Sequence, residues 1–113
     1  ELPHWINEED LSFYVDQISS SGFRGGLNWY RNINRLAAIT APYIGATLTQ
    51  PSFYMGGSTD LIAGNTPEAI SSMQQALGDL RHCEIIEGAG HWLQQECSSE
   101  VSSAMVNFLE GLD

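Results

Sequence analysis

An aspartate and a histidine stand in glycine-rich segments where they could form an acid–base pair. Asp60 lies in the segment GGSTDLI, and His91 lies in the segment GAGHW. Histidine changes its charge near neutral pH and can act as a general base. An aspartate bonded to one ring nitrogen would hold the imidazole in one tautomer and stabilise its charged form. The other ring nitrogen would then be free to take a proton.

No nucleophile accompanies this pair in an obvious motif. The chain has no Gly-x-Ser-x-Gly elbow, which would mark a serine nucleophile. Cys83 and Cys97 have no neighbouring base, and their spacing matches no metal-binding motif. We expect both thiols to be reduced, with a disulfide between them as the alternative. An acid–base pair alone therefore does not account for a reaction that proceeds through a covalent intermediate.

Each candidate also has a purely structural alternative. An aspartate that follows Gly-Gly-Ser-Thr often serves only to form a turn. The glycines beside His91 would let the backbone approach a ligand or another segment closely. A group of aromatic residues is expected to pack in a core: Phe23, Trp29, Tyr30 and Trp92. Tyr30 is the exception to consider, because its phenol can donate a hydrogen bond from an apolar wall.

The residues around the pair predict the order strand, helix, strand, helix. The apolar run at 51–55 and the segment 82–86 are expected to be buried strands. Helices are expected from 66 to 77 and from 98 to 109. This order is typical of a right-handed βαβ crossover with parallel strands. Sites of such sheets lie just beyond the carboxyl ends of the strands, where Asp60 and His91 would meet.

The first part of the sequence predicts helices without strand partners. Asn7 is a candidate cap for a helix over 8–18, and a shorter helix is expected over 27–34. Residues 37–50 are expected to form a loop. Two parallel strands would leave edges and apolar faces uncovered, so the chain is expected to be the end of an α/β protein. Its start at Glu1, without methionine, is typical of a processed or truncated product.

Composition narrows the classes of partner. The chain has 113 residues, 42% of them hydrophobic, and its fourteen acids and four arginines give a formal charge of −10. This charge repels phosphate backbones and anionic membrane surfaces, which argues against nucleic-acid binding. There is no apolar run long enough for a membrane span and no export leader, so we expect a cytoplasmic location.

Three segments carry a resemblance to a known family. SGFRGGLNWYRN, GGSTDLI and GAGHWLQQE, in this order and spacing, resemble the C-terminal third of an α/β-hydrolase-fold epoxide hydrolase of the bacterial soluble type. The resemblance extends from Leu2 to about Leu112, and LNWYRN is its most specific part. It implies that residues 1–36 end a helical cap, or lid. Residues 37–113 would be the C-terminal part of the core, with its last two parallel strands and helices.

The same resemblance implies a reaction and residue roles. An aspartate nucleophile, upstream and outside this chain, would open an epoxide and form an ester. Tyr30 would be one of two tyrosines that polarise the epoxide oxygen. His91, held by Asp60, would activate the water that releases a vicinal diol. Apolar residues implied for the pocket wall are Ile33, Leu61, Ile62 and Trp92. The substrates would be a small-molecule epoxide and water, with no cofactor and no metal.

Three segments differ from the family pattern, and two other functions fit the same residues. Leu36-Ala37, Cys97-Ser98 and the segment 63–75 differ from the pattern, although none of them removes an expected catalytic residue. A haloacid or haloalkane dehalogenase of the same fold would share the pair and the ester but would need groups that hold a halide. A non-catalytic fragment is the third alternative, because the chain alone lacks the nucleophile. The exposed edge predicts association with the missing N-terminal part of the fold or with another copy.

Overall fold

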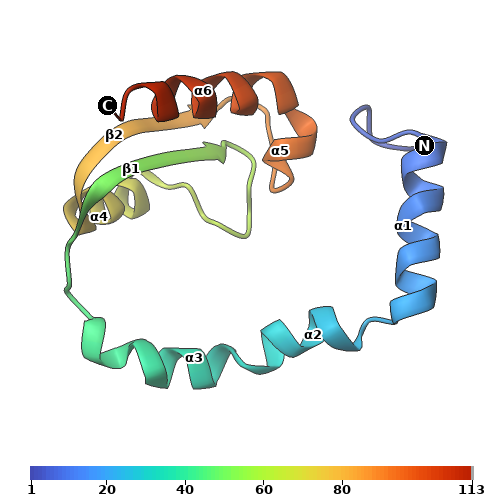
Figure 1. Ribbon diagram of the computed structural model, residues 1–113, viewed down its shortest axis with the longest axis horizontal. Coiled ribbons are helices and arrows are strands. Elements are labelled where there is room, and N and C mark those ends of the chain that lie inside the picture. The colour runs from blue at the N-terminus through green and yellow to red at the C-terminus, as the bar shows by residue number, and fades with distance from the viewer. Residues whose placement is uncertain (113) are drawn as a thin grey trace. The chain divides into compact units, whose positions relative to one another are not determined.

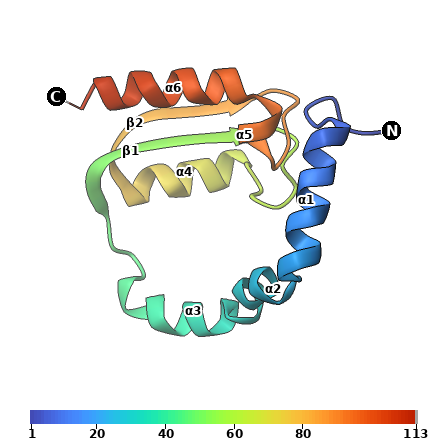
Figure 2. The ribbon, with the colours of Figure 1, turned by 45° about the vertical axis from the view of Figure 1, so that its right-hand side comes forward.

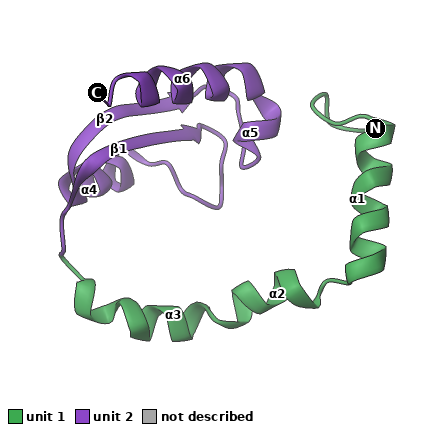
Figure 3. Cartoon of the chain, in the orientation of Figure 1, with its two compact units in different colours: residues 1–45 green, residues 46–113 purple. Residues whose placement is uncertain are grey.

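The chain forms two compact units, Glu1–Gly45 and the residues from Ala46 onward (Figure 3). The computed structural model describes residues 1–112. The expected change from cap to core after residue 36 falls inside helix α3 (Ile33–Thr40), before the division between the units. The assignment of the two parts to a cap and a core stays a prediction.

Helix α1 (Glu8–Ser21) begins where the sequence predicts. The side chain of Asn7 accepts a hydrogen bond from the backbone N–H of Asp10 at 2.9 Å. The carboxylate of Asp10 in turn accepts one from the backbone N–H of Asn7 at 3.2 Å. This reciprocal capping box satisfies free N–H groups of the first turn, and the acids there face the positive end of the helix dipole. The helix closes at Gly22, whose φ of 68° suits glycine.

Two short helices stand where one helix and a loop were predicted. Helix α2 (Arg24–Arg31) ends at Asn32, whose side-chain amide donates to the backbone carbonyl of Asn28 at 2.7 Å. Such local bonding competes with the helical ladder and divides the expected helix at 27–34. Helix α3 and a short 3-10 helix, η1 (Ala41–Tyr43), then occupy much of the expected loop at 37–50. Pro42 fits in η1, because the first turn of a helix needs no N–H there.

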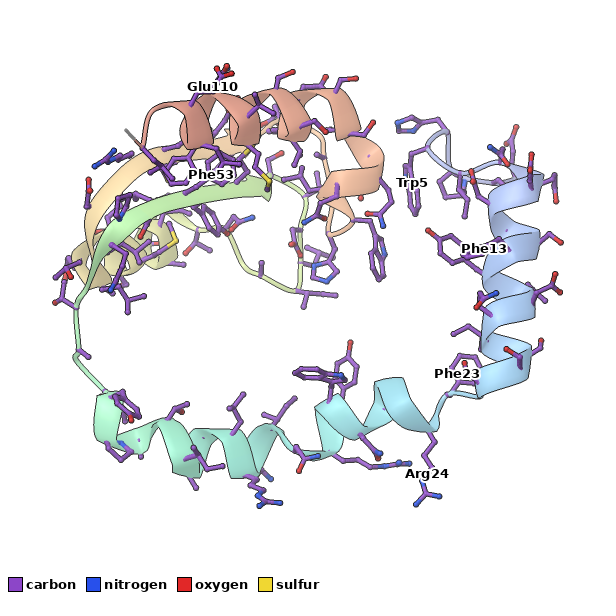
Figure 4. All side chains as sticks on the ribbon, viewed as in Figure 1. Trp5, Phe13, Phe23, Arg24, Phe53 and Glu110 are labelled. Carbon is purple, nitrogen blue, oxygen red and sulfur yellow. The ribbon has the colours of Figure 1, made fainter. Side chains whose placement is uncertain are left out.

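The first unit buries none of its described side chains. The ring of Phe13, labelled in Figure 4, meets Tyr14 edge-on with centroids 6.1 Å apart, yet both residues are exposed. The expectation of core packing is wrong for Phe23, Trp29 and Trp92, which are exposed, and Tyr30, the exception considered, is exposed as well. Within the described part of this unit, successive helices form no second layer that could cover an apolar face.

The second unit is the predicted βαβ arrangement. Strands β1 (Leu48–Gly57) and β2 (Leu77–Ile86) are parallel and are joined through helix α4 (Pro67–Ala76). Figures 1 and 2 show α4 on one face of the sheet and helix α6 (Ser98–Glu110) on the other. The register pairs Tyr54 with Cys83 and Gly57 with Ile86, so both strands end at the same edge.

Both strands begin earlier than their apolar runs suggest. Backbone hydrogen bonds between strands do not require apolar side chains, so the pairing extends back to Leu48 and Leu77. Irregularities of register flank Pro51, which has no N–H to donate to the ladder.

In the part of the chain that the structure describes, no helix is both long enough and apolar enough to span a membrane.

A small core lies at the carboxyl ends of the strands. Its buried residues are Ala89, Leu93 and Val101, and the partly buried residues that pack against them are Met55, Ile86 and Cys97. Further along the sheet, Phe53 packs on Phe108 of α6 with ring centroids 5.4 Å apart. Packing is therefore densest directly beneath the loops that follow β1 and β2, which gives those loops a fixed base.

Candidate active site

Hydrogen bonds join the loop after β1 to the loop after β2. The backbone N–H of Ser58 donates to the carbonyl of Ile86 at 3.0 Å, and the N–H of Gly88 donates to Oγ of Ser58 at 2.9 Å. The N–H and the hydroxyl of Thr59 both donate to the carbonyl of Ala89, at 2.9 and 2.8 Å. The loops that carry the two candidate residues are thus held as one assembly.

Gly57 permits the close approach of the two loops. A Cβ atom at this position would overlap the backbone carbonyl oxygens of Ala89 and Gly90. Only glycine leaves this space open, which is a common reason for glycine where two backbones meet. In the sequence, Gly56-Gly57 is visible only as the end of a strand.

Asp60 and His91 meet, as predicted. Nδ1 of His91 lies 3.0 Å from Oδ2 of Asp60. The carboxylate side chain is 7% exposed, whereas the imidazole side chain is 44% exposed. This geometry commits Nδ1 to the aspartate and leaves Nε2 as the nitrogen that can exchange a proton with water. The catalytic roles of both residues stay predictions.

Asp60 is at once a turn former and the partner of the histidine. Its Oδ1 atom accepts hydrogen bonds from the backbone N–H groups of Ile62, at 2.8 Å, and Ala63, at 3.0 Å. The bond from Ala63, followed by the bond with His91, lowers the pKa of Asp60 below its ordinary value. The turn therefore keeps the carboxylate ionised and aims its second oxygen at the imidazole.

Tyr54 and Asn65 support the Asp60 loop from the strand. The phenol of Tyr54 donates to Oδ1 of Asn65, and Nδ2 of Asn65 donates to the carbonyl of Gly57 at 2.9 Å. Burial, and then the negative charge of Asp60, raises the pKa of Tyr54, so the phenol remains a neutral donor. No pattern in the sequence points to this pair.

Glu96 contacts the His91 loop from the short helix α5 (Leu93–Glu96). Its Oε2 atom accepts a hydrogen bond from the N–H of Gly90 at 2.6 Å, and its Oε1 atom accepts one from the N–H of Trp92 at 3.0 Å. Sequence reasoning assigned no role to Glu96. The available signal was its presence at the end of the segment GAGHWLQQE.

The other predicted site residues are divided between the two units. The ring of Trp92 meets the imidazole of His91 edge-on, with centroids 5.5 Å apart. Leu61 and Ile62 follow Asp60 on the same loop and are exposed. Tyr30 on α2 and Ile33 at the start of α3 belong to the first unit, and Tyr30 is 73% exposed.

Among residues 1–112, no group of three or more His, Cys, Asp or Glu residues is placed to hold a metal ion.

The parallel βαβ unit, with a helix on each face, defines the class of fold. It is the C-terminal part of an α/β-hydrolase fold, as predicted. The crystal structure of epoxide hydrolase A from Mycobacterium thermoresistibile matches all of this chain with a TM-score of 0.86 and 38% identity. An epoxide hydrolase from Vigna radiata matches 98% of the chain with a TM-score of 0.89 and 30% identity. The chain covers 35% and 36% of these two structures.

Curated sequences agree with the structural comparison. The chain is 41% identical to epoxide hydrolase A of Mycobacterium tuberculosis and 35% identical to an epoxide hydrolase of Caballeronia sordidicola, in each case over 99% of its own length. It spans about a third of the length of these relatives. No family model matches the chain. The resemblance inferred from the sequence, to one third of an epoxide hydrolase, is confirmed.

Proposed function

We propose that the polypeptide that contains this chain is an epoxide hydrolase, and that Asp60 and His91 perform its hydrolytic step. The observation that carries the proposal is the 3.0 Å contact between Nδ1 of His91 and Oδ2 of Asp60. It lies in a chain that is similar along 99% of its length to epoxide hydrolases. The substrates are a small-molecule epoxide and water.

The first step forms an ester. A carboxylate nucleophile, supplied by polypeptide outside this chain, attacks an epoxide carbon, and the bond from that carbon to the epoxide oxygen breaks. The phenol of Tyr30 donates its proton to this oxygen and becomes a phenolate. The product is a hydroxyalkyl ester of the enzyme. The exposed position of Tyr30 on α2 supports this role, because the phenol is accessible to a substrate.

The second step releases the diol. Water gives a proton to Nε2 of His91 while its oxygen attacks the ester carbonyl. The ionised Asp60 stabilises the imidazolium that forms. Collapse of the tetrahedral intermediate breaks the bond between the acyl carbon and the alkoxy oxygen. The hydroxyl that came from water gives its proton to that oxygen, which restores the carboxylate and frees the diol. The imidazolium then returns its proton, through water, to the phenolate of Tyr30.

Apolar side chains near these groups fit a substrate with an apolar body. Trp92 lies beside the imidazole, and Leu61 and Ile62 are exposed next to Asp60. Together with Ile33 they are proposed to line the pocket. Burial of their surface against a substrate would favour binding and exclude bulk water from the ester.

The variant His91→Gln tests the proposal. It is made in the whole polypeptide that the gene encodes, which is called the gene-encoded protein below. Mixed with styrene oxide, the unaltered protein should release the diol. The variant should form the ester, seen as added mass on the intact protein, and hydrolyse it about 100- to 10,000-fold more slowly. His82→Gln is the matched control, because His82 lies on β2 and bonds Glu84 instead. Full turnover by His91→Gln would contradict the assignment.

Two further outcomes would replace the proposal. Halide release from a haloalkane, without diol release from an epoxide, would identify a dehalogenase with the same acid–base pair. Diol formation by the isolated 113-residue chain would contradict a nucleophile outside it. A gene-encoded protein with neither activity would support a non-catalytic role.

A further inference from the structure

Glu96 holds the backbone on both sides of His91. Its two carboxylate oxygens accept hydrogen bonds from the N–H groups of Gly90, at 2.6 Å, and Trp92, at 3.0 Å. These two residues are the direct neighbours of His91 in the chain. One carboxylate therefore spans the peptide segment from which the imidazole projects.

The carboxylate itself has a fixed base. Glu96 is partly buried and closes α5, where its own N–H donates to the carbonyl of Trp92 at 2.9 Å. Leu93, at the other end of this turn, is buried in the core. A Cβ atom on Gly90 would come within 3.0 Å of Oε1 of Glu96, so the missing side chain at Gly90 lets the carboxylate approach. Hydrogen bonds to an ionised acceptor are stronger than neutral ones, which suits a restraint.

The ring and the backbone of His91 are held by different residues. Asp60 bonds the imidazole ring at Nδ1, whereas Glu96 bonds the backbone that carries the ring. The direction of the bond from Cα to Cβ follows from that backbone. If the hydrogen bonds to Glu96 were lost, the backbone of the His91 loop could shift. The imidazole would then shift with it, even while its hydrogen bond to Asp60 remained.

We propose that Glu96 is the positioning residue that directs His91 toward Asp60 and toward the water that hydrolyses the ester. This inference rests on the proposed function. Glu96 touches neither the ring nor the reacting atoms, so it acts only through the position of His91. A displacement of about 1 Å in a catalytic group can slow a reaction by about 100-fold.

The variant Glu96→Gln removes half of this restraint. An amide keeps one acceptor oxygen, but its NH₂ group cannot accept a hydrogen bond from a backbone N–H. In the gene-encoded protein with styrene oxide, ester hydrolysis should slow by up to about 100-fold, while ester formation is unchanged. Because kcat then reports ester hydrolysis, kcat and KM should fall by the same factor. The ratio kcat/KM, which reports binding and ester formation, should remain unchanged. Equal slowing of both steps would indicate a general structural role and overturn the proposal.

Glu100→Gln is the matched control. It makes the same change of charge at a nearby exposed position on α6, where the side chain makes no hydrogen bond within the described residues. Both rates should remain unchanged in this variant. Glu96→Asp keeps two acceptor oxygens and should restore hydrolysis in part. If Glu96→Gln does not fold, the aspartate variant should show the same selective loss in a weaker form, and equal loss in both steps there overturns the proposal.

Imidazole ¹⁵N chemical shifts of His91 test the positioning without the reaction. They should change in Glu96→Gln and remain unchanged in Glu100→Gln. Unchanged shifts in both variants would overturn the proposal about Glu96 whatever the activity. A shift change in Glu96→Gln, in a protein that forms neither ester nor diol, would leave the positioning role standing and contradict the proposed function alone.

Discussion

His91 and Asp60 are 31 positions apart in the chain, yet Nδ1 of the histidine lies 3.0 Å from Oδ2 of the aspartate. The contact arises because β1 and β2 are parallel neighbours whose carboxyl ends meet at one edge. Thr59 then ties its loop to the carbonyl of Ala89 with two hydrogen bonds. A chain that spans about a third of the length of its relatives therefore contains both members of the candidate acid–base pair.

Asp60→Asn should uncouple the pair without removing its turn. The asparagine can keep an oxygen for the N–H groups of Ile62 and Ala63, but it offers no charge to an imidazolium. We expect ester hydrolysis to slow by about 10,000-fold, the effect of the same change in a Ser–His–Asp triad. Single-turnover measurement of diol release checks this, with Asp79→Asn, whose side chain pairs with Arg81, as the control. Hydrolysis at the unaltered rate would show that His91 needs no aspartate.

The stability that Asp60 contributes should depend on pH. Hydrogen bonds from Ala63 and His91 lower the pKa of Asp60 in the folded state. The contribution is therefore fully present above the unfolded value, about 3.9, and is lost as pH falls through the lower folded value. Urea unfolding of the gene-encoded protein and of Asp60→Asn should give free energies of unfolding that converge below about pH 4. A difference that stays constant from neutral to acid pH would contradict the lowered pKa.

Tyr30→Phe should slow the formation of the ester. Removal of one donor to a developing oxyanion costs about 100- to 1,000-fold in rate. Hydrolysis of an ester already formed should change much less, because His91 and Asp60 are intact. Rapid-quench measurement of ester formation checks this prediction. Tyr43→Phe, at another exposed tyrosine of the first unit, should leave both steps unchanged. Equal rates of ester formation for Tyr30→Phe and the unaltered protein would remove Tyr30 from the mechanism.

Gly57→Ala should destabilise the fold and separate the two loops. The new methyl group would overlap the carbonyl oxygens of Ala89 and Gly90, which are backbone atoms with little room to move. Overpacking of this kind costs about 1–3 kcal/mol in the free energy of unfolding. Urea unfolding measures it. Gly25→Ala is the control, because nothing lies within 4 Å of a Cβ there and alanine favours the helix. A Gly57→Ala variant as stable as the parent would mean that the loops adjust.

Local signals in the sequence were reliable where a few neighbouring residues decide the outcome. Asn7 caps α1 as predicted, and the apolar runs around Phe53 and Ile85 mark strands. The prediction missed the break at Asn32 in the helical segment 27–34, and it was wrong for most of the loop expected at 37–50. There, the side chain of Asn32 bonds the backbone and divides the helix. Pro42 does not end the helical stretch, because it occupies a position that needs no N–H.

The sequence by itself determined the parallel βαβ unit and the pairing of Asp60 with His91. Both follow from the order of periodic segments and from the rule that sites of parallel sheets lie at the carboxyl ends of strands. Only the tertiary structure decided what holds the pair in place. The hydrogen bonds of Glu96, and those of Asn65 with Tyr54 and Gly57, join side chains to one another and to backbone groups. The positions of those groups depend on loop conformation, which no periodicity of side chains encodes.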